Sequence, residues 1–431
     1  MMNCYLLDGE FQSNGIEFEN FDEIEAALGK NQNLLYCMPV QAVIMLLDEW
    51  SKAISKDKSI LKREGTAYLS FFLRKNNIEK LIVNSLGDKK YLDEFVDIGQ
   101  GKFIKAQGRG VVCHWIAGNI KTLAFFSLIQ SILGGNSNLL RVPKDNIHEV
   151  LDIISLFSTI KVEYQNKWYH SMDIIKNISL VCFDSGAYGL NKRMSLLADA
   201  RVIWGGEEAV NSINALPKKT TCRDVVFGPK YSLAVMDKTI ANLEQSQLQN
   251  YINAFAQDVA QFDQDACSSP HVLFIEGTFE KAKEIAEVLA KAFEKINKRY
   301  SNIVGEAKAS KIINERGRYG LSLDKECYAS RDLSYTILID SELSLKEPVS
   351  GRCVYIKSVG DIFQIEKLIT KKVQTVGFGS LDNDRTIKFA NKLSRRGVDR
   401  IARLGSMNIY DYPWDGTFLL NELVRWCSLN L

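Results

Sequence analysis

The sequence lacks the usual marks of a disulfide framework or a metal site. Its nine cysteines are odd in number and scattered, and none forms a CxxC pair, which excludes a simple disulfide framework and gives no zinc-ligand spacing. The four histidines show no HExxH or related spacing. We therefore expect no metal, and we interpret Cys113, Cys182 and Cys353, which lie in apolar strand-like runs, as core residues.

The sequence also lacks a charge bias and a long apolar run. The formal net charge is only +2, so there is no broad basic excess to neutralise nucleic-acid phosphates. No basic segment followed by an apolar one opens the chain, and no apolar run is long enough to span a bilayer. These absences predict a cytoplasmic protein with neither a nucleic-acid partner nor a membrane span.

What is present is typical of a soluble globular enzyme of about two or three domains, with 431 residues, of which 46% are hydrophobic and 25% charged. Residues 1–85 look mostly helical after a short start. From Gly101 onward, apolar runs of strand length alternate with helical segments, which predicts parallel strands with helical crossovers and hence open α/β sheets. Such sheets bind ligands at the carboxyl ends of their strands.

The alternation forms two sections. In the first, we expect strands at 111–117, 138–142, 179–183, 201–204, 224–227 and 232–236, and helices at 121–133, 147–157, 191–198 and 207–215. In the second, we expect strands at 272–276, 335–340, 353–357, 375–379 and 400–404, and an outer helix at 279–298. A last helix at 417–426 is expected after the turn-forming stretch Tyr412–Gly416.

The stretch Gln261–Pro270 carries the strongest chemical signal. It joins an amphipathic helical run, 247–261, to a strand-like run, 271–276, so Cys267 lies on a junction loop that a substrate can reach. A thiolate nucleophile needs such a place, and nearby backbone N–H groups can lower its pKa from about 8.5. The alternative, a small buried hydrophobe, is the default for any single cysteine.

Two further stretches each place one polar side chain after a strand. Asn119 could donate its amide to an oxyanion, although on local sequence alone a helix cap is favoured. Arg141 follows a short strand, where its guanidinium could meet ribose or phosphate oxygens, and a surface arginine is about equally expected.

Two later turns also follow strands. The first leads into a helix and would present backbone N–H groups to an anion, but it does not form a GxGxxG pattern and is weak by itself. The candidate residues are Trp204, Gly205 and Gly206 in the first turn, and Phe227 and Gly228 in the second.

Taken in order, these stretches and the cysteine loop resemble the aldehyde dehydrogenase superfamily, across roughly Gly110 to Pro270. The closer resemblance is to the LuxC-type acyl-CoA reductases, the long-chain fatty acyl reductases known from bacterial bioluminescence. It covers about Lys102 to the C-terminus, and its closest matches are Arg109–Asn119, Gly134–Arg141 and Arg396–Gly416. The resemblance implies an α/β, aldehyde-dehydrogenase-like fold of two doubly wound α/β domains with a helical N-terminal segment.

The resemblance also implies a reaction. In the family a cysteine attacks an acyl thioester, acyl-CoA or acyl-protein, and the resulting acyl-cysteine is reduced to an aldehyde by hydride from NADPH. Cys267 matches the nucleophile, and Asn119 matches the side chain that holds the developing oxyanion. Arg141 matches the cofactor-binding lysine near the adenosine ribose, where a cation is compatible with the 2′-phosphate of NADPH. The remaining cofactor-binding matches are Trp204, Gly205, Gly206, Phe227 and Gly228.

One departure from the family pattern is informative. Val226 falls where oxidising members have a glutamate, the general base that activates water to hydrolyse the acyl-enzyme. Its absence suits a reductase, whose thioester must survive until hydride arrives.

By resemblance, the domains are a helical segment at 1–90, a cofactor-binding domain at 91–240, completed by part of 405–431, and a catalytic domain at 241–404. The family also suggests a homo-oligomer and a complex with an acyl-protein synthetase. Two alternatives stay open: an oxidising or CoA-acylating aldehyde dehydrogenase with another base, and a non-catalytic acyl-carrier or scaffold partner that keeps only the fold.

Overall fold

The computed structural model describes residues 1–298 and 304–431. The chain forms two compact units, the first made of Met1–Gly228 with Asp411–Leu431 and the second of Pro229–Tyr410. The boundary lies before the expected one at residue 240, because the strand β12 (Tyr231–Met236) pairs with strands of the second unit.

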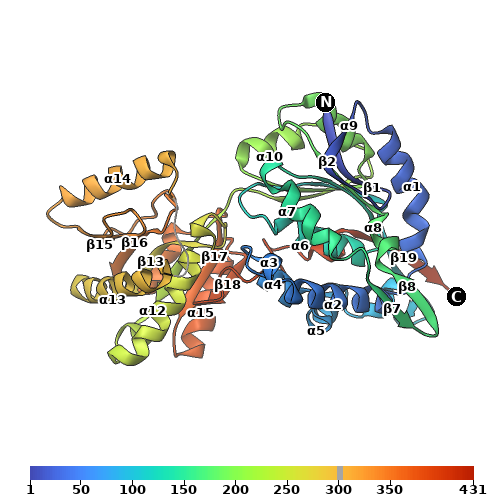
Figure 1. The fold of residues 1–431 in the computed structure, drawn as a ribbon. Helices are drawn as coiled ribbons and strands as arrows, with labels where there is room; N and C mark the ends of the chain where they lie inside the picture. The colour runs from blue at the N-terminus through green and yellow to red at the C-terminus, as the bar shows by residue number, and fades with distance from the viewer. Residues whose placement is uncertain (299–303) are drawn as a thin grey trace. The chain divides into compact units, whose positions relative to one another are not determined.

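The first unit contains a seven-stranded sheet in the order β11-β10-β5-β6-β9-β1-β2 (Figure 1). Pairing is parallel from β11 through β9, and β1 and β2 add two antiparallel strands. The central parallel strands are largely buried because helices cover both of their faces. The strands are β1 (Met2–Leu7), β2 (Glu10–Phe18), β5 (Val111–Trp115), β6 (Ser137–Arg141), β9 (Ile178–Cys182), β10 (Ala200–Trp204) and β11 (Arg223–Phe227).

Alternate residues of the central strand β5 face different helices. Cys113 and Trp115 belong to an apolar cluster with α1 (Asp22–Tyr36), α9 (Tyr188–Leu197) and α10 (Glu207–Asn214). His114, which points to the other face, bonds to Ser127 at 3.1 Å. That face carries α6 (Leu123–Leu133) and α7 (Lys144–Ser155).

The N-terminal residues 1–90 are part of this unit, and the short start before their helices is the β1–β2 hairpin, which the expected helical segment did not include. The helices follow: α2 (Val40–Lys56), α3 (Lys58–Leu61), α4 (Thr66–Phe72) and α5 (Lys75–Leu86). Trp50 of α2 stacks on Phe157 with ring centroids 4.5 Å apart and meets Phe125 edge-on at 5.7 Å. These aromatic contacts hold α2 against the layer of α6 and α7.

The expected final helix at 417–426 is wrong. Only α16 (Leu419–Glu422) is helical, and β19 (Val424–Asn430) then pairs along its whole length with β4 (Lys102–Gly108). With β3 (Val96–Asp97) these strands make a three-stranded sheet, and β7 (Lys161–Tyr164) and β8 (Lys167–His170) form a separate hairpin. The short helices η1 (Lys89–Leu92) and α8 (Ser171–Ile175) complete the unit.

The second unit contains a seven-stranded sheet in the order β14-β15-β16-β13-β12-β17-β18, parallel except for the edge strand β14. Its central strands are buried along their whole length, which explains why they were recognisable as apolar runs. Besides β12, the strands are β13 (Pro270–Glu276), β14 (Glu326–Ala329), β15 (Thr336–Asp340), β16 (Cys353–Val359), β17 (Val373–Gly379) and β18 (Arg400–Arg403).

Two apolar clusters cover the two faces of this sheet. One includes α11 (Lys238–Ala241), α12 (Gln245–Ala260) and α13 (Phe279–Asn297). The other includes α14 (Glu306–Gly320), η3 (Ile362–Leu368) and α15 (Asn383–Ser394). Figure 1 shows α12 and α13 side by side on one side of the sheet and α14 on the other.

Within residues 1–298 and 304–431, no helix combines the length and the apolar composition that a bilayer crossing requires. The same residues contain no group of three or more His, Cys, Asp or Glu side chains placed to hold a metal ion. Cys113 and Cys353 are fully buried, as expected, whereas Cys182 is only half-buried at the end of β9.

Candidate active site

The loop that carries Cys267 begins with a strained turn. Directly after α12, the short helix η2 (Gln261–Gln264) holds Phe262, Asp263 and Gln264 at φ values of 58°, 45° and 65°. Side chains with a Cβ rarely adopt this left-handed region, and each such residue costs on the order of 1–3 kcal/mol. The surrounding contacts must therefore hold the turn in place.

Buried polar contacts supply that restraint. Arg352, which is 1% exposed, pairs with Asp263 at 2.7 Å, and Gly351 N–H donates to the Asp263 carbonyl at 2.9 Å. The Gln264 side chain donates to the carbonyls of Pro270 and Cys353 at 2.9 and 3.2 Å. The turn is thereby fixed from both sides, and the chain reaches residue 267 in one defined direction.

Cys267 is half-buried at the amino end of β13, next to the amino ends of β12 and β17. Ser232 Oγ of β12 donates to the Cys267 carbonyl at 2.7 Å, and Thr375 N–H of β17 donates to Ser232 Oγ at 3.1 Å. Gln374 Nε2 of β17 donates to Cys267 Sγ at 3.2 Å. Both the backbone and the sulfur of Cys267 are therefore held by neighbouring strands.

The two serines that follow the cysteine are anchored to one asparagine. Ser268 and Ser269 donate to Asn408 Oδ1 at 2.7 and 3.1 Å, and Asn408 Nδ2 donates to the Asp258 carbonyl at 2.7 Å. The Asp258 carboxylate in turn accepts from Met407 N–H at 3.0 Å. Burial raises the pKa of Asp258 to about 7, and its backbone N–H donors oppose that rise.

The carboxylates nearest to Cys267 in the sequence are all engaged. Asp263 is paired with Arg352, Asp265 is paired with Lys308 at 2.7 Å, and Asp258 accepts backbone N–H groups. A general base must be able to reach the water that it activates. None of these three carboxylates is disposed for that role, because each is committed to holding the loop.

The other cysteines of the strands differ from Cys267 in their environment. Burial raises the pKa of Cys353 to about 12 and that of Cys113 well above its ordinary value. Such thiols stay protonated near neutral pH and cannot act as nucleophiles. Cys267 is the cysteine on a half-exposed loop with a hydrogen-bond donor on its sulfur.

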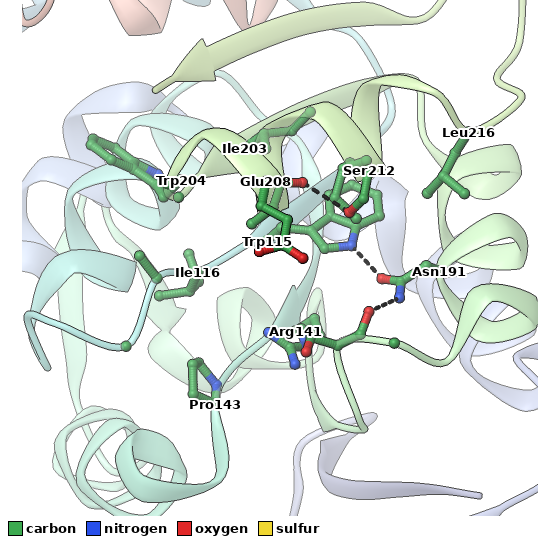
Figure 2. A pocket seen from close by; sticks show the side chains of 18 of the residues that line it. Trp115, Ile116, Arg141, Pro143, Asn191, Ile203, Trp204, Glu208, Ser212 and Leu216 are labelled. Atoms are coloured by element: carbon green, nitrogen blue, oxygen red, sulfur yellow. Dashed lines mark hydrogen bonds between the residues drawn. The ribbon is translucent and has the colours of Figure 1, made fainter. Parts of the chain in front are cut away.

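A pocket of about 580 Å³ lies in the first unit at the carboxyl ends of β5, β6 and β10. Its size falls in the range of about 300–1,000 Å³ that is usual for ligand and cofactor sites. Trp115 Nε1 donates to Asn191 Oδ1 at 2.8 Å, and Asn191 Nδ2 donates to the Ser185 carbonyl at 2.9 Å (Figure 2). These bonds fix the wall of the pocket between β5 and α9.

Arg141 and Trp204 line this pocket and bring side-chain N–H donors to it. Arg141 Nη2 donates to the Phe183 carbonyl at 3.0 Å, but within the described residues the buried Arg141 Nε and Trp204 Nε1 have no hydrogen-bond partner. Burial lowers the pKa of Arg141, because the guanidinium is partly removed from water. A buried donor without a partner is costly, so the pocket is built to receive acceptor atoms.

Gly205 and Gly206 form the turn between β10 and α10. A Cβ on Gly205 would lie 3.1 Å from the Ala209 side chain, so the turn approaches the helix closely. The helix N-terminus favours anions, but its first turn already carries Glu207 and Glu208. Since Glu208 lines the pocket, the turn suits ribose hydroxyls as well as phosphate oxygens.

Six of the predicted site residues were assigned to cofactor binding. Arg141, Trp204, Gly205 and Gly206 line one pocket. Phe227 and Gly228 are not among the described residues that line it, and their assignment to the cofactor stays a prediction: the Phe227 ring stacks on Trp204 with centroids 3.8 Å apart, and Gly228 directly follows β11.

Asn119 and Val226 are both exposed positions of the first unit, whereas Cys267 belongs to the second. The loop of Asn119 is held by Asn146, whose Nδ2 donates to the Gly118 carbonyl at 3.2 Å. Val226 is 39% exposed on β11 and brings no carboxylate to that position.

Sequence reasoning missed the residues that hold the cysteine loop and the pocket wall. Gln374 and Asn408 are polar and buried in otherwise apolar surroundings, which is a signal that a partner must exist but does not name it. Asn191 and Trp115 were within recognised segments, yet their contact is visible only in the fold.

The fold is that of the aldehyde dehydrogenases, as structural comparison shows. An aldehyde dehydrogenase from Bacillus cereus matches with a TM-score of 0.71 at 12% identity, covering 100% of this chain and 96% of that chain. An NADP-dependent glyceraldehyde-3-phosphate dehydrogenase from Bacillus halodurans, solved with NADP, matches with a TM-score of 0.70 at 13% identity, covering 100% and 99%. The predicted fold class is confirmed.

The chain belongs to the acyl-CoA reductase (LuxC) family, whose model matches residues 35–426. Similar proteins are named long-chain acyl-protein thioester reductases. One from Photorhabdus luminescens is 26% identical over 385 residues, covering 86% of this chain and 74% of that protein. One from Aliivibrio fischeri is 26% identical over 360 residues, covering 80% and 69%.

Proposed function

We propose that this protein reduces a long-chain acyl thioester, acyl-CoA or acyl-protein, to an aldehyde with NADPH, through a covalent acyl-cysteine on Cys267. The observation that carries the proposal is the half-exposed Cys267 thiol, fixed at the amino end of β13 with a donor on its sulfur. Family membership and the names of the similar proteins support the substrate class.

In the first step, the Cys267 thiolate attacks the acyl carbonyl and the carrier leaves as a thiolate, which then takes a proton from water. The strained turn and the serine–Asn408 contacts hold the loop still, so the sulfur is presented in one orientation. Such fixed geometry is a large part of the rate gained by an enzyme.

The acyl-cysteine must then persist until hydride arrives, without being hydrolysed by water. The nearby carboxylates of Asp258, Asp263 and Asp265 are committed to other partners, and Val226 supplies none at its own position. The absence of a disposed base in this set supports reduction over hydrolysis, and therefore disfavours an aldehyde dehydrogenase that releases free acid.

The nicotinamide cofactor supplies the hydride when bound. We assign it to the pocket of the first unit, because the orphaned Arg141 Nε and Trp204 Nε1 fit an acceptor-rich ligand such as a ribose phosphate. Glu208 can accept from ribose hydroxyls, and Arg141 can hold the 2′-phosphate with its planar fork. By family resemblance, we propose Asn119 as the amide donor to the oxyanion.

Turnover with product analysis tests the proposal. Purified protein supplied with tetradecanoyl-CoA and NADPH should form one aldehyde and one free coenzyme A per NADPH oxidised, with little free fatty acid. The unactivated fatty acid serves as the control donor and should give no aldehyde. Release of free fatty acid as the main product would favour the oxidising type, in which water hydrolyses the acyl-enzyme. If neither an acyl adduct on Cys267 nor bound cofactor were detected, a scaffold role would be favoured.

Replacing Arg141 tests the cofactor assignment. In Arg141→Gln we expect the KM for NADPH to rise roughly 10- to 100-fold, since a charge-assisted hydrogen bond is worth about 1.5–3 kcal/mol. The KM for NADH should change less than about threefold, because NADH carries no 2′-phosphate. Initial rates with both cofactors measure this, and Arg141→Lys, which keeps the charge, is the matched control. An equal rise for both cofactors would refute the 2′-phosphate contact.

The proposal also covers the proteins with which this chain assembles. The names of the similar proteins point to an acyl-protein as the donor, so we propose a complex with an acyl-protein synthetase and a homo-oligomeric enzyme. Co-purification with such a synthetase and light scattering of the purified chain check the two points separately.

A further inference from the structure

The partner of the Cys267 sulfur is an unusual one. Gln374, the second residue of β17, is 1% exposed, yet its Nε2 donates to Cys267 Sγ at 3.2 Å. A buried amide normally donates to an oxygen, and a neutral thiol is a weak acceptor. Burial of the amide against sulfur is far better compensated when the sulfur carries a negative charge, because hydrogen bonds to an ion are about twice as strong.

The rest of the Gln374 side chain is fixed in a way that turns its NH₂ group to the sulfur. Thr375 Oγ1 donates to the side-chain Oε1 of Gln374 at 3.4 Å, and the Gln374 main chain is held by Asp399 N–H, which donates to its backbone carbonyl at 3.1 Å. Thr375 N–H also contacts Ser232, which holds the Cys267 carbonyl. One strand therefore positions the sulfur, its backbone and the donor together.

We propose that Gln374 is a catalytic residue of the reaction proposed above, on which this inference rests: its amide donates to the Cys267 thiolate both when the sulfur attacks and when it leaves. In the attack, the Sγ–C bond forms and the bond from the acyl carbon to the carrier sulfur breaks. The acyl carbon then receives hydride from the reduced nicotinamide, which is thereby oxidised, and a tetrahedral alkoxide results. This alkoxide re-forms its C=O bond. The C–Sγ bond then breaks, the aldehyde departs, and the electron pair returns to Cys267.

The negative charge is thus on Sγ at both ends of the cycle, and the Gln374 donor faces it each time. A donor that stabilises the thiolate makes it available at neutral pH and also makes it a better leaving group. A residue that only filled space at this position would alter packing without changing how the thiol titrates, and this difference can be measured.

The test follows alkylation of the Cys267 peptide by iodoacetamide between pH 5 and 10, resolved by mass spectrometry, with no acyl donor or cofactor present. In Gln374→Leu we expect the rate at pH 7 to fall about tenfold, with the same plateau at high pH, because the thiol titrates about one unit higher. The isosteric Gln374→Glu, which places a carboxylate against the sulfur, should shift the profile further.

Gln130→Leu is the matched control, because Gln130 is also buried and donates from Nε2, to the Phe126 carbonyl at 2.9 Å in the first unit. Its Cys267 profile should match that of the parent protein. An unshifted profile in Gln374→Leu and Gln374→Glu, with thermal transitions near that of the parent protein, would overturn the inference. It would leave the proposed function standing, since that fails instead if a protein without Cys267 still makes aldehyde.

Discussion

Cys267→Ala should abolish both acyl-enzyme formation and aldehyde production, with a fall in turnover of about 10⁴-fold or more, as expected for loss of a nucleophile. The truncation removes the sulfur acceptor of the buried Gln374 amide, so it should lower stability by about 1–3 kcal/mol. Intact-protein mass spectrometry after mixing with acyl-CoA measures the acyl adduct, and NADPH oxidation measures turnover.

Cys327→Ala is the matched control for this substitution. Cys327 is also a half-buried free cysteine of the second unit, on the edge strand β14. That variant should keep the acyl adduct and the activity. If Cys267→Ala still produced aldehyde at a rate close to that of the parent protein, the covalent mechanism would be wrong, whatever the cofactor.

Arg201→Met should destabilise the first unit by about 3–5 kcal/mol, the usual cost of breaking a buried, hydrogen-bonded ion pair. Arg201 is fully buried on β10 and makes bonds of 2.7 and 2.8 Å to the two carboxylate oxygens of Asp224. It also donates to Ser195 Oγ at 2.9 Å and to the Ile213 carbonyl at 3.1 Å. The substitution leaves Ser195 Oγ and the Ile213 carbonyl without this buried donor, whereas Asp224 keeps its pairing with Lys218 at 2.5 Å.

Calorimetry should show the transition of the first unit lowered by about 10 °C. Cofactor affinity should fall as well, because α10, which Arg201 ties to the sheet, supplies part of the pocket wall. Arg193→Met is the control, since Arg193 is 45% exposed and pairs with Asp22 and Glu25 on the surface. That variant should change the transition by less than about 2 °C, and an equal effect of both substitutions would contradict the prediction.

The regular part of the fold could be predicted because it depends on local pattern. Parallel strands that are covered on both faces are buried along their length and mostly apolar, so β10, β13 and β17 stood out from the helices between them. The junction loop of Cys267 could be located for the same reason, because it lies between two such elements.

Prediction from the sequence failed for segments whose conformation is set by strand pairing and not by their local sequence preference. A helix was expected at 417–426, yet Val424–Asn430 pair as a strand with β4, more than three hundred residues earlier in the chain. Strands β1 and β2 extend the first sheet only because the edge of β9 is available to them. A strand at a sheet edge is stabilised by its neighbour, and a sequence window does not contain that neighbour.

The sequence by itself determined the class of fold, the order of its motifs and the cysteine on a junction loop, since each of these depends on residues that are close in the chain. Only the tertiary structure decided what touches that cysteine. Gln374 lies 107 residues from Cys267, and Asn408 lies 140 residues from Ser268. Such contacts form when strands assemble into a sheet, and hydrogen bonds between distant side chains leave no periodic pattern from which they could be read.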